Sequence, residues 1–224
     1  MADALEKQIE EDIVFGVYPP GTRLIEDRIM ERYNVSRHAT RAAFSALESR
    51  KLLVHMPNKG VEVIRYTPDE VDALYDIRMV LETAAAERTK LAVSSDIVNK
   101  LNQIAHDHEA AWQNGEYREV FALNLQFHHV QYSCCQNAPL IRLIEDYTRM
   151  VQPIRAIKYD DPAHMREVIF QHHQIIRAMQ GTNQQAYIDA VRKHLPASAK
   201  AYREFYAKRF DRSPAHPVPD RKSG

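Results

Sequence analysis

The chain has 224 residues, of which 45 % are hydrophobic and 27 % are charged, and its formal net charge is zero. This is the composition of an ordinary globular protein with one large or two modest domains. It contains no apolar run of the roughly 20 residues that cross a membrane, and its acidic start, MADALEKQIEED, does not resemble a signal peptide.

The first 66 residues predict three helices followed by a small β-hairpin. Apolar residues recur at helical spacing from Leu5 to Val14, and the breaker GVYPPG follows them. A second, short helix covers IEDRIMERY, and Ser36 is placed to cap a third helix that ends near Arg50. The segments LLVHM and VEVIR flank PNKG, a pattern typical of a two-stranded wing. Together these elements indicate a winged helix-turn-helix.

Helical periodicity dominates from Pro68 almost to the end, and the whole chain has only six glycines. The predicted helices cover residues 68–93, 95–113, 116–136, 138–158, 161–181 and 183–210. Pro153 and Pro196 fall inside two of them and should kink them, because proline removes a backbone donor. The predicted fold is therefore mainly α, with a winged helix-turn-helix at 1–66, an all-α six-helix bundle at 67–210 and a disordered tail at 211–224.

The third helix lies in the basic segment of the chain. Residues 33–66 hold six Lys or Arg against two acidic residues, whereas residues 3–31 hold eight acidic residues against three basic ones. Arg37 and Arg41 share one face near the helix N-terminus, where phosphate is attracted and where arginine can pair with guanine. A solvated charged face is the alternative. The residues predicted to bind DNA are Ser36, Arg37, His38, Thr40 and Arg41, with Lys59 and Gly60 at the tip of the wing.

Three of the later helices each turn a histidine toward an apolar face. At about 100° per residue, His128 lies about 40° from Asn124 among apolar residues, whereas His129 lies about 140° away and faces water. His172 and His194 point inward by the same test. Buried polar groups need partners, so these are either hydrogen-bonded core histidines or the shared ligands of a metal ion. Imidazole suits zinc, nickel, copper or iron, and an amide oxygen can complete the site.

Arg78 also lies on an apolar helix face, with Glu82 one turn away. A buried guanidinium needs a partner. That partner is either Glu82 or the carboxylate of a small organic acid, which guanidinium binds bidentately. In the second case, Tyr75, Gln131 and Tyr147 could line the same effector cavity.

Residues 5 to 66 resemble the GntR superfamily of bacterial transcription regulators. The resemblance rests on the pattern I-x-x-D-I-x-x-G-x-x-x-P-G-x-x-L-x-E from Ile9 to Glu26, on NVSRHATRAAFSALESRKLL, and on NKGVEV in the wing. It implies that Arg37 and Arg41 are the two arginines of the recognition helix and that Gly60 is the wing glycine. Ala42 stands where the family usually has glutamate.

Residues 68 to about 205 resemble the all-helical FCD effector domain of the FadR branch of this superfamily, and six helices resemble its VanR-like subgroup. The family pattern of Asp-x-x-Phe-His, a later inward His and a final His before Leu matches Asn124 to His128, His172 and His194. This implies a divalent metal ion (zinc or nickel) on Asn124, His128, His172 and His194 beneath the effector pocket. Asn124 replaces the usual aspartate, so the ion would keep its full charge for an anion.

These patterns predict a cytoplasmic transcription regulator that binds double-stranded operator DNA as a homodimer, rather than an enzyme. Repression relieved by a small carboxylate metabolite is the default hypothesis. Cys134 and Cys135 are adjacent and unsuited to a structural disulfide, which fits a reducing compartment. One alternative is a metal-dependent enzyme built on the helical bundle, although the Glu-x-x-His spacing of di-iron bundles is absent from the inward faces. The other is an effector-binding protein with a weak DNA module.

Overall fold

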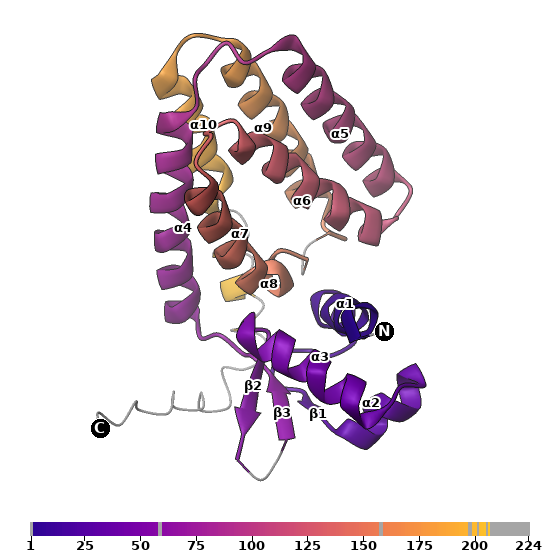
Figure 1. The fold of residues 1–224 in the computed structure, drawn as a ribbon. Coiled ribbons are helices and arrows are strands. Elements are labelled where there is room, and N and C mark those ends of the chain that lie inside the picture. The colour runs from indigo at the N-terminus through magenta and orange to yellow at the C-terminus, as the bar shows by residue number, and fades with distance from the viewer. Residues whose placement is uncertain are drawn as a thin grey trace, which may run out of the picture.

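A computed structural model of the chain describes residues 2–57, 60–156, 159–196, 199–200, 202–204 and 206. A small winged part and a larger all-helical part lie end to end, joined where the long helix α4 begins (Figure 1). The predicted fold class, a winged helix-turn-helix followed by an all-α domain, is therefore confirmed. Two sequence predictions, the wing residue Lys59 and the tail at 211–224, lie outside the described residues.

The winged part combines three helices with a three-stranded antiparallel sheet of strand order β1-β3-β2. Its elements are α1 (Ala2–Val14), β1 (Arg23–Leu24), α2 (Glu26–Tyr33), α3 (Arg37–Ser49), β2 (Leu53–Met56) and β3 (Gly60–Val63). The sequence predicted β2 and β3 but not β1, because two residues are too few to show an alternating pattern. The core beneath the sheet includes Leu5, Ile9, Ile13 and Leu47, all at most 1 % exposed.

The helical part contains seven labelled helices within the described residues. They are α4 (Pro68–Arg88), α5 (Ser95–Gln113), α6 (Tyr117–Ser133), α7 (Ala138–Met150), α8 (Gln152–Ala156), α9 (Pro162–Gln180) and α10 (Gln184–His194). The start of α4 is fixed by a capping box, in which Thr67 and Glu70 exchange side-chain and backbone hydrogen bonds. The α5–α6, α9–α10 and α5–α9 pairs pack against one another around the buried histidines.

Three predicted helices differ from the observed ones in length. The helix expected over 138–158 is divided at Val151 into α7 and α8, with Pro153 in the first turn of α8, where its missing N–H breaks no helical bond. The last labelled helix ends at His194, two residues before Pro196, but residues 196, 199–200, 202–204 and 206 are helical again, so the interruption falls next to Pro196 as expected. Helix α4 ends at Arg88 rather than at residue 93, because Thr89 adopts an extended conformation.

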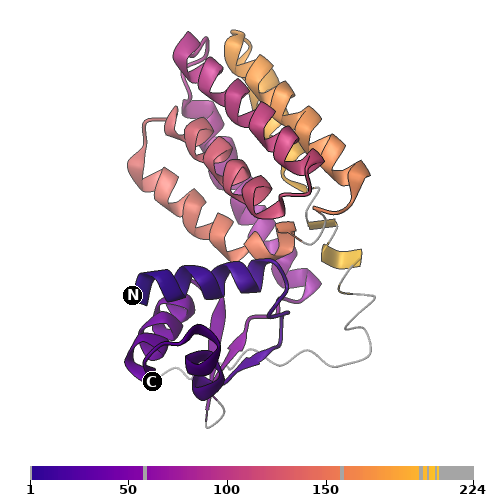
Figure 2. The ribbon, with the colours of Figure 1, turned by 90° about the vertical axis from the view of Figure 1, so that its right-hand side faces the viewer.

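Helix α1 lies along the boundary between the two parts, directly beneath the helical bundle (Figure 2). It contacts α8 as well as α3. Arg118 at the start of α6 binds Glu11 of α1, and the rings of Phe15 and Phe121 meet edge to face with centroids 5.8 Å apart. No helix among the described residues is long and apolar enough to cross a membrane.

Candidate DNA interface and metal centre

The N-terminus of α3 presents the two predicted recognition arginines on the outside of the winged part. Ser36 caps the helix by accepting a hydrogen bond of 3.2 Å from the backbone N–H of Ala39, so the predicted cap is confirmed. The side chains of Arg37 and Arg41 are 55 % and 64 % exposed, and His38 beside them is exposed as well. A capped, basic helix end of this kind can approach phosphate or the major groove.

Both arginines bind carboxylates at the start of α2. Arg37 Nη2 lies 2.7 Å from Asp27 Oδ1, and Arg41 Nε lies 2.8 Å from Glu26 Oε1. These ion pairs were not predicted from the sequence. They join residues 10 and 15 positions apart, beyond the reach of any helical spacing rule.

Two of the other residues predicted to bind DNA, Thr40 and Gly60, have structural roles in the winged part. Thr40 is wholly buried, and its hydroxyl donates to the Ser36 carbonyl oxygen at 3.1 Å, so it does not reach base edges as expected. The reason is that its face of α3 packs on the core of the winged part. Gly60 has φ +85°, and a Cβ there would lie 3.4 Å from the Leu24 carbonyl oxygen. The wing therefore requires glycine for its own backbone path.

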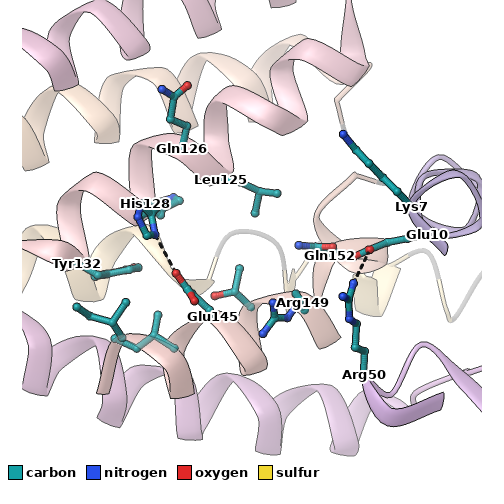
Figure 3. A pocket seen from close by; sticks show the side chains of 14 residues that line it. Lys7, Glu10, Arg50, Leu125, Gln126, His128, Tyr132, Glu145, Arg149 and Gln152 are labelled. Atoms are coloured by element: carbon teal, nitrogen blue, oxygen red, sulfur yellow. Dashed lines mark hydrogen bonds and ion pairs between the residues drawn. The ribbon is translucent and has the colours of Figure 1, made fainter. Parts of the chain in front are cut away.

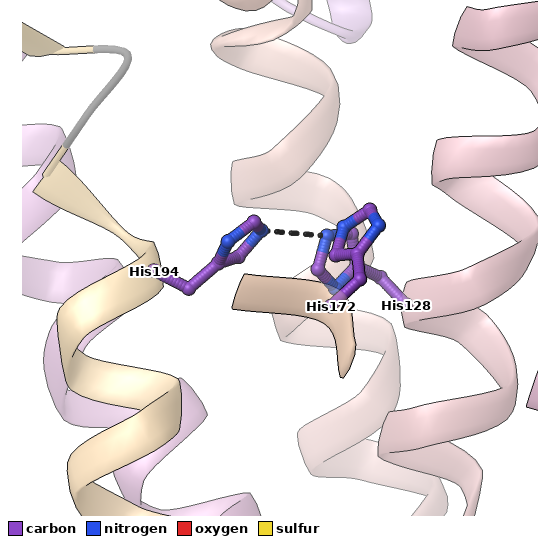
Figure 4. Close-up of side chains that lie close together, drawn as sticks. All are labelled: His128, His172 and His194. Atoms are coloured by element: carbon purple, nitrogen blue, oxygen red, sulfur yellow. Dashed lines mark hydrogen bonds between the residues drawn. The ribbon is translucent and has the colours of Figure 1, made fainter. Parts of the chain in front are cut away.

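Three histidines from three helices converge inside the helical part (Figure 4). They are His128 of α6, His172 of α9 and His194 at the end of α10, and their ligand nitrogens lie within 4.8 Å of one another. His128 Nε2 and His194 Nε2 are 3.2 Å apart. The predicted grouping of these histidines is thus present in the structure. Histidine donors at these positions fit a zinc or nickel ion.

Two glutamines orient the rings of His194 and His128. Gln171 Nε2 donates to a Glu167 carboxylate oxygen at 2.7 Å, which turns Gln171 Oε1 toward His194 Nδ1 at 2.9 Å. Because a carbonyl oxygen only accepts, His194 Nδ1 must carry the proton, and Nε2 presents a lone pair. Gln131 Oε1 lies 3.0 Å from His128 Nδ1 and has the same effect there.

Two imidazole lone pairs that face each other at 3.2 Å repel unless a proton or a metal ion lies between them. Two nitrogen ligands at about 2.0–2.1 Å from a tetrahedral ion would be about 3.3–3.4 Å apart. The observed separation suits such an ion, and a hydrogen-bonded partner on the other ring nitrogen is typical of metal-bound histidine.

Asn124 and His108 lie in the same buried region. Asn124 precedes His128 by one turn of α6 and is 4 % exposed, whereas His129 is exposed and binds Glu145 at the surface, as its angle predicted. His108 was not predicted from the sequence, and its ring centroid is 5.2 Å from that of His172. The signal was available, because His108 continues the apolar face of Leu101, Ile104 and Ala105 on α5.

Arg78 has its carboxylate partner inside the protein. Its Nε and Nη2 lie 2.9 Å and 2.7 Å from Glu82 Oε1, and Glu82 also accepts from the Tyr132 hydroxyl. Of the two alternatives raised by the sequence, the structure therefore shows the internal pair, and we do not assign Arg78 to an effector. Gln131 orients His128, while Tyr75 and Tyr147 pack in an apolar cluster with Val71.

A cavity of about 610 Å³ extends from the histidine centre to the boundary with the winged part (Figure 3). This volume is that of an ordinary small-molecule site. Its walls come from α6, α7 and α8 and from three residues of the winged part, Lys7, Glu10 and Arg50. None of Arg78, Tyr75, Gln131 and Tyr147 lines it, so the four residues predicted to bind the effector are not brought together around this cavity.

A capped basic helix in a winged helix-turn-helix, joined to an all-helical domain with a buried histidine cluster, defines a DNA-binding transcription regulator. The chain belongs to the GntR family of bacterial regulatory proteins and carries a C-terminal FCD domain. Residues 1–63 match the GntR family, and residues 73–197 match the FCD domain. The resemblance found in the sequence is therefore confirmed.

Curated relatives and solved structures agree with this assignment. The chain is 27 % identical over 205 residues to the HTH-type transcriptional repressor RspR of Escherichia coli, covering 91 % of this chain and 89 % of that protein. It is 27 % identical over 188 residues to the HTH-type transcriptional regulator YdhC of Bacillus subtilis, covering 84 % of each. Escherichia coli McbR/YncC has the same fold, with a TM-score of 0.77 at 20 % identity, over 91 % of this chain and 98 % of that one. The family and these relatives are transcription regulators and not enzymes.

Proposed function

We propose that this protein represses transcription by binding operator DNA as a homodimer, and that a small organic acid bound near a divalent metal ion controls its affinity for DNA. The observation that carries the proposal is the exposed pair Arg37 and Arg41 at the capped end of α3. The relative RspR, a repressor by name, supports the direction of regulation. Such a protein acts where the chromosome is, in the cytoplasm.

The DNA claim is tested by mobility shift with duplexes selected from a random library by the wild-type protein. Replacing both Arg37 and Arg41 with alanine should raise the dissociation constant roughly 30-fold or more, because each bidentate contact contributes about 1–3 kcal/mol. The matched control replaces two exposed arginines of the helical part, Arg142 and Arg177, and should bind as wild type. Equal affinity of the two double variants would instead favour an effector-binding protein with a weak DNA module.

The metal claim rests on the converging histidines and their glutamine partners. His128, His172 and His194 would hold zinc or nickel, with the amide oxygen of the buried Asn124 as a further donor. When bound, the ion would supply a positive charge at the inner end of the cavity. Protein purified without chelator should contain close to one metal ion per chain, and His128→Ala should contain far less. A content below about a tenth in wild type would instead make the histidines structural.

The effector claim rests on the cavity, because His128 lies at its inner end and Lys7 and Arg149 also line it. A carboxylate suits such a positive site. A thermal-shift screen of small organic acids should find ligands that raise the melting temperature of the wild type, with smaller shifts for His128→Ala. If every acid in the screen leaves the melting temperature unchanged, an organic-acid effector is excluded for this cavity.

The homodimer claim rests on the outer face of α4. Ala73, Ile77, Val80 and Ala84 form an apolar stripe along the side opposite the buried Arg78 and Glu82, and Val80 is 68 % exposed. Spacings of four, three and four residues are those of a helix that pairs with another helix. Two copies paired along α4 would present two recognition helices, as a palindromic operator requires.

A further inference from the structure

The cavity that reaches the histidine centre has two chemically distinct ends. His128 and Tyr132 lie at the inner end, and Lys7, Glu10 and Arg50 of the winged part lie at the outer end, with Leu125 between them (Figure 3). Ile141 and Ile144 add to the apolar walls. Glu145 and Thr148 of α7 also line the cavity, so its apolar wall is on one side only. An apolar wall between polar ends fits an elongated ligand that is charged at both ends.

The outer end has a positive charge that the protein does not fully neutralise. Arg50 is balanced by Glu6 and Glu10, which lie 2.6 Å and 3.1 Å from its Nη1. Lys7 is exposed and makes no ion pair with any described residue. Among the described residues, Arg149 forms an ion pair with Asp146, itself 59 % exposed, so solvent weakens that pair.

Arg149 of α7 lines the same cavity as Lys7 and Glu10 of α1. Burial raises the pKa of the Glu10 carboxyl, whereas the charges of Arg50 and Arg149 act to lower that pKa. A second hollow of about 310 Å³ adjoins this end and shares Lys7, Glu10, Leu125 and Gln152 with the first.

We propose that Lys7 of the winged part and Arg149 of the helical part together bind the second anionic group of a dianionic organic acid whose first anionic group faces the histidine centre. This inference rests on the proposed organic-acid function of the cavity and specifies its ligand class. Lys7 belongs to α1, and α1 packs on the recognition helix α3. A ligand held at both ends thus ties the recognition helix to the helical part, and its binding is coupled to DNA binding.

The test compares dicarboxylates with monocarboxylates of the same chain length. Succinate, adipate, suberate and sebacate are titrated by calorimetry, each beside its monocarboxylate, into the full-length protein with and without zinc. The best dicarboxylate should bind wild type about tenfold tighter than its monocarboxylate, because a charge-assisted contact contributes about that factor. Lys7→Glu and Arg149→Glu should each lower the dicarboxylate affinity at least about tenfold and the monocarboxylate affinity by much less, which abolishes the preference.

The matched control is Lys100→Glu on the exposed side of α5, which should keep the preference. Circular dichroism melting confirms that each variant is folded. A second readout is independent of affinity. The bound dicarboxylate should slow acetylation of Lys7 by an amine reagent, followed by mass spectrometry, and leave the rate at Lys100 unchanged.

The outcomes separate this inference from the function on which it rests. If acids of both kinds bind equally and neither charge reversal changes the affinity, the organic-acid function stands, but Lys7 and Arg149 do not bind a second anionic group. If Lys7 remains fully reactive while a dicarboxylate is bound, Lys7 does not bind the second anionic group. If no acid binds wild type with or without zinc, the organic-acid function itself fails and this inference fails with it.

Discussion

In the proposed function, Arg37 and Arg41 have different partners in the free and the DNA-bound protein. Without DNA, each guanidinium is held by a carboxylate at the start of α2. On DNA, phosphates or guanine edges would have to replace those carboxylates. Exposed ion pairs contribute only about 0–1 kcal/mol, so this exchange costs little free energy and Glu26 and Asp27 would not prevent DNA binding.

Replacing Asp27 with asparagine should therefore strengthen DNA binding, up to about fivefold at low salt, because Arg37 then leaves just the looser pair with Glu26, whose Oε2 is 3.8 Å from its Nη1. Fluorescence anisotropy with the selected duplex measures the change. Glu31→Gln is the control, since it removes an exposed acid from the same helix that pairs with neither arginine. An equal gain in both variants would mean that only general repulsion from DNA was relieved. A loss in Asp27→Asn would mean that Asp27 orients Arg37.

Asn124 is the second residue whose identity has a measurable consequence. As a neutral donor it adds no charge to the proposed histidine site, whereas aspartate would attract a divalent ion directly. Asn124→Asp should tighten zinc roughly tenfold in competition with a chromophoric chelator. Asn99→Asp, on the exposed side of α5, should leave zinc affinity unchanged. If Asn124→Asp gains nothing, Asn124 is not a ligand.

Helix α6 connects the histidine centre to the winged part. Its start binds α1 through Arg118 and Phe121, and its middle carries Asn124, Phe127 and His128 inside the bundle. Asp12 of α1, close to Arg118, also accepts hydrogen bonds from Arg32 and Tyr33 of α2. One helix therefore touches both the proposed ligand centre and the support of the recognition helix.

Two phenylalanines, Phe127 on α6 and Phe170 on α9, should contribute very differently to the free energy of unfolding. Phe127 is 0 % exposed and stacks on His172 with ring centroids 4.1 Å apart, whereas Phe170 on α9 is 51 % exposed. Phe127→Ala should lower the free energy of unfolding by about 3–5 kcal/mol. Phe170→Ala should change it by no more than about 0.5 kcal/mol. Urea denaturation of both variants measures this, and similar losses would contradict the assigned faces of these helices.

For the whole molecule, the proposed dimer determines how two recognition helices reach one operator. Val80→Glu places a charge in the centre of the apolar stripe on α4, so the protein should sediment as a monomer. Its affinity for a palindromic duplex should fall at least about tenfold, because two linked half-sites no longer act together. Binding to a single half-site should persist. Phe170→Glu, an equal change on α9, should remain dimeric; if both variants keep the wild-type mass, α4 is not the dimer interface.

Features set by neighbouring residues could be read from the sequence. Helical periodicity placed the helices and turned His128, His172 and His194 inward, while Ser36 marked the start of the recognition helix. Two helix ends were predicted wrongly. The backbone at Thr89 is extended and ends α4, and the chain is interrupted before Pro153, which lies in the first turn of a new helix. Helical periodicity also places His108 on the apolar face of α5, so its burial could have been predicted. Burial of Thr40 was missed because its position on α3 alone does not show which face meets the sheet.

Only the tertiary structure decided the contacts between distant residues. Gln171 orients His194 from 23 positions away, and the Tyr132 hydroxyl reaches Glu82 across 50 positions. The cavity wall that joins Lys7 to Arg149 likewise depends on how the winged part docks on the bundle. The sequence by itself determined which side chains share one face of a helix, because that depends on local backbone geometry. It did not determine which partners they meet, because that depends on how whole helices pack.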